Sequence, residues 1–263
     1  MIVRHEARAE DDGYRSPLAA GLRSTADARH LAAEVGFAAA RLHVLEHDPP
    51  GLYAEIAAEG DLEEATWLAF LVAYLGPRDD PDPFAAIAAV RTSWGVLPDL
   101  TQAMPGPRGS YDPARAAASL DSYRRFAERA GGQAAAFISD SAWTAEQRFE
   151  RVHERLALPG LHRRARYDLL VTLGRLGRYP LAAPALLLTE DDDVMLAAKR
   201  VFGIGDRRTL ERRASALSAA MAVPVEALDL GLENWARAER ITQGVPDAAD
   251  DAARERAQAA LGC

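Results

Sequence analysis

The residues best suited to chemistry lie between Leu196 and Trp235. Two glycines, Gly203 and Gly205, stand in an apolar turn of sequence VFGIG, and an isolated acid, Asp229, follows between two leucines. Glycine lets a backbone turn sharply and lets another backbone approach closely. Open amides at such a turn, just before a helix, can hold one phosphate of a nucleic-acid backbone. A lone carboxylate near that clamp can act as a general base.

Basic residues lie on both sides of this turn. Residues 199–213 contain six Lys or Arg and two acids, and residues 161–178 contain five Arg and one acid, whereas residues 1–100 contain 17 acids and eight Arg. A basic surface on a chain of net charge −8 is compatible with a polyanionic partner. Two solvated helix faces are the alternative interpretation. The candidate phosphate ligands are Arg163, Arg164, Arg200, Arg207 and Arg208.

The elements that must position these residues are helices. Apolar residues recur at helical spacing along most of the chain, and Asp206 stands where a helix N-cap belongs. Alternation typical of strands is nearly absent, so we predict an all-α fold. Residues 94–113 are rich in Gly and Pro, and residues 1–22 show no sustained hydrophobic period. Both segments are therefore expected to be irregular. The expected helices are 24–48, 61–75, 84–90, 112–130, 144–157, 162–176, 191–201, one from 207, one after Pro224 that continues past Trp235, and one from 247.

The predicted helix 61–75 has a second acid of interest. Asp61 followed by Glu64 has the layout of a capping box, and an apolar stripe that includes Trp67 and Tyr74 follows. Glu64 therefore either caps the helix or faces a pocket beside Trp67. Plain core packing is the alternative for the stripe itself.

Composition excludes several classes of protein. The 263 residues are 49% hydrophobic and 27% charged, as in ordinary globular proteins. Cys263 is the only cysteine, so an internal disulfide, a four-cysteine zinc site and an iron–sulfur cluster are excluded. No serine-hydrolase, P-loop or zinc-hydrolase motif occurs. Without an 18-residue apolar run, and with charges throughout the first thirty residues, we expect a cytoplasmic protein without a membrane span or signal peptide.

Four segments resemble the helix-hairpin-helix DNA glycosylase superfamily over roughly residues 60–240. GLHRRARYDLL at 160–170 resembles the helix before the hairpin, VFGIGDRRT at 201–209 resembles the hairpin, and ALDLGLENW at 227–235 resembles the segment that carries the catalytic aspartate. WLAFLVAYLGPR at 67–78 is similar to the helix and loop that push a wedge residue into the duplex. The resemblance implies a glycosylase-like domain over 23–263, with two helical lobes, a cleft between them, and the hairpin at about 196–213.

The same resemblance implies roles for individual residues. Asp229 becomes the expected catalytic carboxylate, with Glu64 as a second candidate, and Trp67, Tyr74 and Lys199 are expected to line the base pocket. Arg78 would be the wedge, and the glycines and arginines already named would hold duplex DNA. A helix N-cap after Pro224 is the structural alternative for Asp229. We expect a monomer without a metal or other cofactor, although the resemblance allows a monovalent cation at the hairpin.

Two departures from the superfamily pattern narrow the chemistry. Phe202 stands where proline is usual, so the geometry of the turn is expected to differ. Arg207 stands where some members have a lysine nucleophile, and a guanidinium stays protonated. Arg207 argues against a lyase that acts through lysine. The resemblance then implies a monofunctional glycosylase that flips a modified pyrimidine out of the duplex and hydrolyses its N-glycosidic bond.

Further strings resemble a narrower family, the α-glutamyl/putrescinyl thymine pyrophosphorylases. They are EEATWLAFLVAYLGP, DPFAAI and AAKRVFGIGD. This family implies an alternative, a transferase in which an amine displaces pyrophosphate from a 5-substituted uracil in DNA to make hypermodified thymine. The cations around the hairpin would hold the pyrophosphate, and Asp229 or Glu64 would deprotonate the amine. A DNA-binding module without catalysis is the third interpretation.

Overall fold

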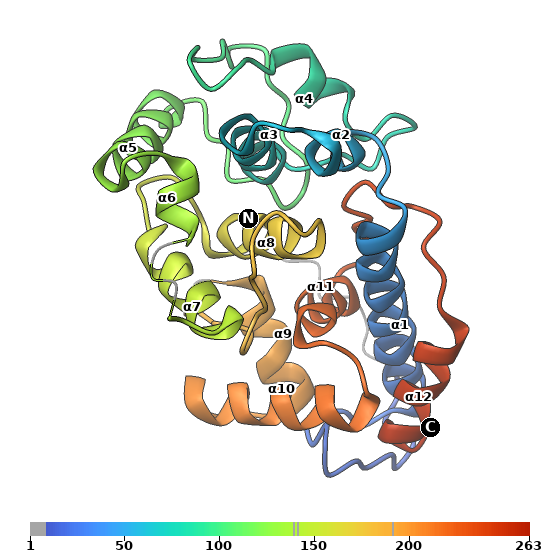
Figure 1. Ribbon diagram of the computed structural model, residues 1–263. Helices are drawn as coiled ribbons and strands as arrows, with labels where there is room; N and C mark the ends of the chain where they lie inside the picture. The colour runs from blue at the N-terminus through green and yellow to red at the C-terminus, as the bar shows by residue number, and fades with distance from the viewer. Residues whose placement is uncertain (1–8, 139, 141, 191) are drawn as a thin grey trace. The chain divides into compact units, whose positions relative to one another are not determined.

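The protein is helical throughout the part that the structure describes. The computed structural model describes residues 9–138, 140, 142–190 and 192–263, and every regular element in these ranges is an α-helix (Figure 1). The all-α prediction is confirmed for this part of the chain. The helices are α1 (Thr25–His47), α2 (Leu52–Ala58), α3 (Leu62–Leu75), α4 (Ala85–Val90), α5 (Ala116–Ala130), α6 (Gln133–Ile138), α7 (Ala145–Arg155), α8 (Arg163–Arg175), α9 (Asp193–Phe202), α10 (Arg207–Met221), α11 (Val225–Ala236) and α12 (Asp251–Leu261).

The chain divides into two compact units. Unit 1 consists of residues 1–42, 185–241 and 247–263, and it contains the first part of α1 together with α9 to α12. Unit 2 consists of residues 43–184 and 242–246, and it contains the end of α1 together with α2 to α8. The hairpin and Asp229 belong to unit 1. The predicted helix with Glu64 and the basic helix α8 belong to unit 2.

Helix α11 is the centre of unit 1. It packs against α9 and α10, and α10 packs in turn against α12 (Figure 1). Leu228 and Leu232 on α11 are fully buried. A Cβ on Gly231 would lie 2.9 Å from the Val35 side chain and 3.1 Å from its Cα, so α11 crosses α1 closely at this point. Glycine at 231 thus permits a helix contact that a larger residue would prevent.

The irregular residues 9–24 are fastened to unit 1 at several points. Asp12 accepts a hydrogen bond from the amide of Thr25 at 3.0 Å, at the start of α1. The hydroxyl of Tyr14 donates to the carbonyl oxygen of Leu261 at 2.5 Å, at the end of α12. Residues 9–24 therefore belong to the packed structure of unit 1, although they contain no helix.

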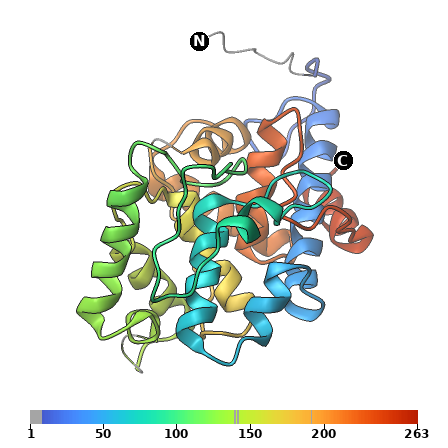
Figure 2. The same cartoon turned by 90° about the horizontal axis from the view of Figure 1, so that it is seen from above.

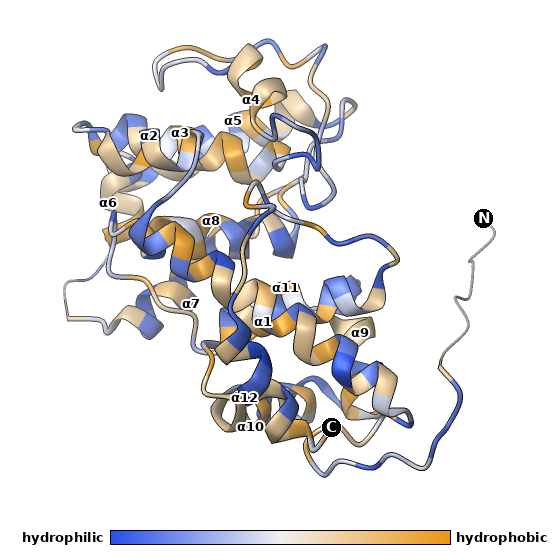
Figure 3. Ribbon diagram, turned by 90° about the vertical axis from the view of Figure 1, so that its right-hand side faces the viewer, coloured by the Kyte–Doolittle hydropathy of each residue, from blue (hydrophilic) through white to orange (hydrophobic). Residues whose placement is uncertain are grey.

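In unit 2, α3 is the core helix. It packs against α2, α6 and α8, and the apolar colours of Figure 3 predominate along it. Trp67 stacks on Phe70, Phe70 stacks on Tyr74 and on Tyr123 of α5, and the ring centroids lie 5.4, 5.5 and 3.7 Å apart respectively. The expected long loop is present, since no helix occurs between α4 and α5 (Figure 2).

The predicted helix starts are largely confirmed, with one correction. Asp206 caps α10, and Thr144 forms a complete capping box with Gln147 at the start of α7. Asp61 caps α3, but it accepts from the amide of Glu63, and no capping box with Glu64 forms. Both carboxylate oxygens of Glu64 accept instead from the amide of Trp94, at 3.0 and 3.1 Å.

Two short helices were not predicted. Helix α6 has six residues, and the carboxylate of Glu63 accepts from its first amides, those of Gln133 and Ala134, at 2.8 Å each. Its start is thus capped by a side chain seventy residues away in sequence, which local patterns do not reveal. Helix α2 has seven residues. Helix α5 begins at Ala116, later than expected, and α11 ends at Ala236 without a long continuation.

Among the described residues, no single helix combines the length and apolar character needed to cross a membrane. Helices α10 and α11 meet that test only when taken together, and the chain bends by 106° between them.

One ion pair of unit 1 ties α1 to the chain after α11. The Arg240 guanidinium donates to both oxygens of the buried Glu34, at 2.6 and 2.8 Å, and His30 lies 3.6 Å from the same carboxylate. Burial by itself raises the pKa of Glu34, but hydrogen bonds from His30 and Arg240 outweigh it and lower this pKa from 4.5 to about 2. The ionised carboxylate therefore stabilises the folded state.

Substitution Glu34→Gln should flatten the pH dependence of unfolding in acid. Because the folded pKa is lowered, the stabilisation is fully present above pH 4.5 and is lost as pH falls toward about 2. Allowing for solvent screening at the half-exposed Arg240, we expect the wild type to lose about 1–2 kcal/mol more than E34Q between pH 5 and pH 3. Urea unfolding at these pH values measures the difference. An equal loss in both proteins would contradict the assigned role, and Glu128→Gln, at an exposed site, serves as control.

Candidate nucleic-acid interface

Helices α9 and α10 form a hairpin at the expected position. Asp192 caps α9, which ends at Phe202, and α10 begins at Arg207 after its own cap, Asp206. Gly203 joins them with φ 82° and ψ 170°, a conformation adopted almost only by glycine. The sequence pattern therefore identified a helix, a glycine turn and a second helix correctly.

The carbonyl side of this turn is occupied. The amide of Gly21 donates to the carbonyl oxygen of Val201 at 2.9 Å, and Nη1 of Arg213 donates to that of Phe202 at 2.7 Å. These carbonyls lie at the negative end of α9, which normally needs partners from outside the helix. The partners come from residues 9–24 and from α10. The last two carbonyls of α9 are thus bound within unit 1.

The amide side of the turn is open. The first amides of α10, those of Arg207 and Arg208, lack an intrahelical acceptor, and they donate no hydrogen bond within the described part of the chain. The side chain of Ile204, at the tip, is 95% exposed. Arg207, Arg208 and Arg212 are exposed, and their side chains form no hydrogen bond or ion pair with a described residue. The hairpin thus presents free amides and free cations to solvent.

One acid moderates this positive surface. Asp206 accepts from the amide of Thr209 at 2.8 Å, and the hydrogen bonds to Thr209 lower the pKa of this exposed carboxyl. It stays ionised at neutral pH, but its charge serves the N-terminus of α10. The three exposed arginines nearby, Arg207, Arg208 and Arg212, leave the surface of the tip positively charged.

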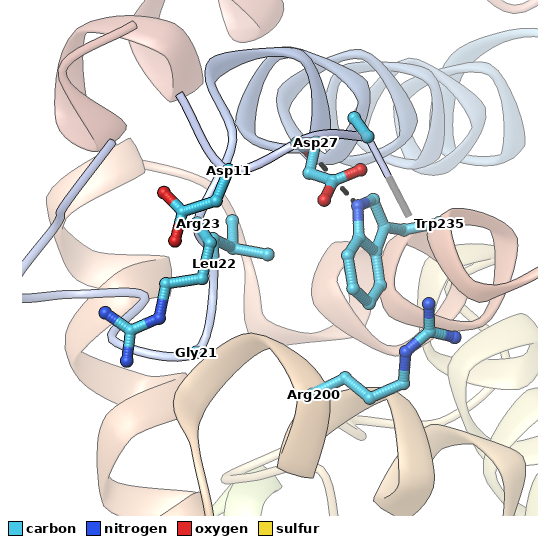
Figure 4. A pocket seen from close by; sticks show the side chains of 8 residues that line it. Asp11, Gly21, Leu22, Arg23, Asp27, Arg200 and Trp235 are labelled. Atoms are coloured by element: carbon cyan, nitrogen blue, oxygen red, sulfur yellow. Dashed lines mark hydrogen bonds between the residues drawn. The ribbon is translucent and has the colours of Figure 1, made fainter. Parts of the chain in front are cut away.

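Arg200 and Lys199, on the last turn of α9, differ from the tip residues. The Arg200 guanidinium lies 4.7 Å from the centroid of the Trp235 indole, within the range of a cation–π contact. Figure 4 shows the Arg200 side chain extending toward this indole, beside a hollow of about 200 Å³ that Arg23 and Asp27 also line. Arg200, expected to bind the DNA backbone, therefore lies against α11. Lys199 is half-buried on the same turn.

Asp229 lies in the middle of α11 and is 1% exposed. Pro224 occupies the N-cap position of this helix, so the N-cap alternative for Asp229 is excluded. The expected partial burial is in fact nearly complete, because α11 packs against α9 and α10 and nearly every residue along it is buried.

Two residues expected to line a base pocket lie in the core of unit 2. Trp67 is 1% exposed, and its indole NH donates to the carbonyl oxygen of Thr92 at 2.9 Å. Tyr74 is fully buried, and burial raises the pKa of its hydroxyl. The pocket prediction for these residues is therefore corrected, because the apolar stripe of α3 is used for packing. Glu64 does border a hollow of about 320 Å³, together with Glu55, Glu59 and Arg91.

The basic residues of unit 2 also have internal roles. Arg163 is buried, and its guanidinium lies 4.5 Å from the centroid of the Tyr167 ring. The cation at this helix start is thus compensated by an aromatic face, and the expected phosphate contact is corrected. Arg164 is half-buried. Arg78, the expected wedge, pairs with Asp80 at 2.5 Å in the loop after α3.

Comparison with known proteins assigns no function to the chain. Neither a family model, nor a curated protein, nor a solved structure matches the chain. The described residues contain no group of three or more His, Cys, Asp or Glu side chains that could hold a metal ion. The assignment of the candidate interface therefore rests on the geometry of the hairpin residues described above.

Sequence reasoning missed three residues that shape this interface. Gly21 and Arg213 donate hydrogen bonds to the last carbonyls of α9, and the Trp235 indole forms a cation–π contact with Arg200. The glycine offered no signal, because it lies in a segment without periodicity. Arg213 was visible only as one more cation.

Substitution Gly203→Ala should destabilise the protein by about 1–3 kcal/mol, because alanine adopts the backbone conformation of Gly203 only with strain. Space does not limit the change, since the nearest atom to an added Cβ is Arg213 Nη1 at 3.9 Å. Urea unfolding measures the loss. Gly60→Ala is the control, because Gly60 has open space and an ordinary φ, and its effect should stay within about 0.5 kcal/mol. Equal effects of the two substitutions would contradict the assigned strain.

Proposed function

We propose that unit 1 binds the backbone of duplex DNA through the α9–α10 hairpin. The observation that carries the proposal is the polarity of the turn. Its carbonyls at Val201 and Phe202 are occupied from within unit 1, while the amides of Arg207 and Arg208 and the cations beside them are open. Open amides at a helix start, with arginines beside them, favour an anion of phosphate size.

The number of contacts suits one short stretch of backbone. Amides at a helix start hold one phosphate, and exposed arginines on the first turns reach its neighbours. Such contacts read no bases, so the hairpin alone confers affinity without sequence preference. The exposed Ile204 places an apolar group beside this surface.

The double substitution Arg207→Gln, Arg208→Gln tests DNA binding. We expect affinity for a duplex to fall about tenfold or more at moderate salt, and the slope of log K against log salt to decrease by about 1–2. Fluorescence anisotropy at several salt concentrations measures both quantities.

Arg125→Gln, Arg129→Gln is the matched control, since it removes the same charge from exposed positions of α5. It should change the slope little. If both double substitutions lowered the affinity equally, DNA would be attracted to exposed arginines in general and not to the hairpin. A wild type that does not bind DNA would overturn the proposal.

We further propose that the chain is a monofunctional DNA glycosylase for a modified pyrimidine, with Asp229 as the catalytic carboxylate. Breaking the glycosidic bond develops oxocarbenium character at the sugar, which a carboxylate stabilises or supplies with activated water. Asp229 lies on α11, which packs directly against both helices of the hairpin. The proposal rests on this proximity of elements and on the family resemblance.

A second candidate function is a DNA-binding module without catalysis. The burial of Asp229 favours it, because a carboxylate that is 1% exposed in this structure does not meet substrate without movement of its surroundings. The two functions share the hairpin and differ only in the role of Asp229.

Substitution Asp229→Asn separates them. Duplexes with thymine, 5-hydroxymethyluracil and bulkier 5-substituted pyrimidines are incubated with the protein and then treated with alkali. A glycosylase leaves abasic sites that cleave, and D229N should lower this turnover about 10²–10⁴-fold while DNA affinity stays within twofold.

Glu226→Gln, a buried acid on the same helix, is the control and should retain activity. Full activity of D229N would remove Asp229 from catalysis. Binding by the wild type without abasic sites on any base would favour the module. On a duplex with 5-(pyrophosphoryloxymethyl)uracil and an added amine, release of pyrophosphate with gain of the amine by the DNA, seen as the corresponding mass change without abasic sites, would instead identify the transferase.

A further inference from the structure

We infer that Gly21 positions the tip of the hairpin, so that residues 9–24 form a brace for the DNA-binding surface. This inference rests on the proposed DNA binding for its functional consequence. Its structural part concerns unit 1 alone and can be tested without DNA.

The contact between Gly21 and the end of α9 is backbone against backbone. The Gly21 amide donates to the Val201 carbonyl oxygen at 2.9 Å. A Cβ added at Gly21 would lie 2.1 Å from the carbonyl oxygen of Arg200 and 2.9 Å from the amide nitrogen of Gly203. Separations below 3 Å do not occur for real Cβ atoms, and these neighbours are main-chain atoms that cannot rotate away. Only glycine fits here.

The brace is fastened on both sides of Gly21. Leu22 and Ala19 are buried, and the amide of Leu22 donates to the carbonyl oxygen of Ala19 at 3.0 Å. Earlier in the segment, Asp12 accepts a hydrogen bond from the first amide of α1, and the Tyr14 hydroxyl donates to the carbonyl oxygen of Leu261 at the end of α12. A side chain at Gly21 would therefore force the brace and the last turn of α9 apart.

Displacement of that turn would reach the open amides directly. The atoms nearest an added Cβ include the nitrogen of Gly203, where the chain leaves α9 for the tip. On the other side, Arg213 holds the carbonyl oxygen of Phe202. Two successive carbonyls are thus fixed by two different segments, and the direction of the amides that follow depends on both.

The first test of the brace uses hydrogen exchange without DNA. In Gly21→Ala, amides in a peptide covering 201–209 should exchange at least tenfold faster than in the wild type, while α3 of unit 2 stays unchanged. Ala20→Val is the matched control, because Ala20 is the exposed neighbour of Gly21, and its exchange should match the wild type. Unchanged exchange in G21A would overturn the inference.

The second test uses a mutant cycle in DNA affinity. G21A should weaken duplex binding about tenfold in the wild-type background and less than twofold in the R207Q/R208Q background, because the tip contact is already lost there. A general loss of folded protein would lower affinity equally in both backgrounds and would overturn the inference. If the wild type binds no DNA, the proposed function fails. The hydrogen-exchange comparison of G21A with the wild type then tests the brace by itself.

A third measurement needs only the wild type and covers the case in which G21A does not fold. Saturating duplex should slow exchange at the Gly21 amide together with the amides of 201–209, because the tip and the brace share a hydrogen bond. Protection of 201–209 with no change at Gly21 would contradict the coupling.

Discussion

Unit 1 depends on the burial of a single helix, α11, among the other helices of the unit. A helix buried on nearly all sides must be apolar or must have partners for its polar groups. Leu228 and Leu232 meet the first requirement, and the small Gly231 lets α1 approach. The second requirement is met in part by Asn234, which exchanges two hydrogen bonds with the backbone of Ile241.

The acids of α11 follow from the same constraint. Glu233 is fully buried, and it pairs at 3.1 Å with the half-exposed Arg237 one turn later. Burying a charge is costly unless it is paired, so acids on such a helix require a reason. Pairing with Arg237 supplies that reason for Glu233. The packing of α9 and α10 against the same helix places the hairpin on this support.

The hairpin combines a satisfied negative end with an open positive end. Helix ends leave carbonyls and amides without intrahelical partners, and both kinds must be bound by something. In unit 1 the last two carbonyls of α9, those of Val201 and Phe202, accept from Gly21 and Arg213, whereas the first amides of α10 are open. This asymmetry is the basis of the anion binding that we propose for the tip, and it contrasts with the acidic hollow beside Glu64 in unit 2.

Sequence patterns predicted the local features of the fold well. The helical class, the hairpin at Gly203, the cap at Asp206 and the box at Thr144 follow from residue types within a few positions, because caps and turns are local interactions. The short helix α6 was missed because its cap, Glu63, is distant in sequence.

The sequence by itself therefore determined which elements form and where the glycine turn lies. Only the tertiary structure decided which side chains remain available for a ligand. Arg163 and Arg207 are both arginines on the first turn of a helix, yet one is buried beside Tyr167 and the other is exposed. Exposure depends on what packs against a helix, and packing joins residues that are far apart in the chain.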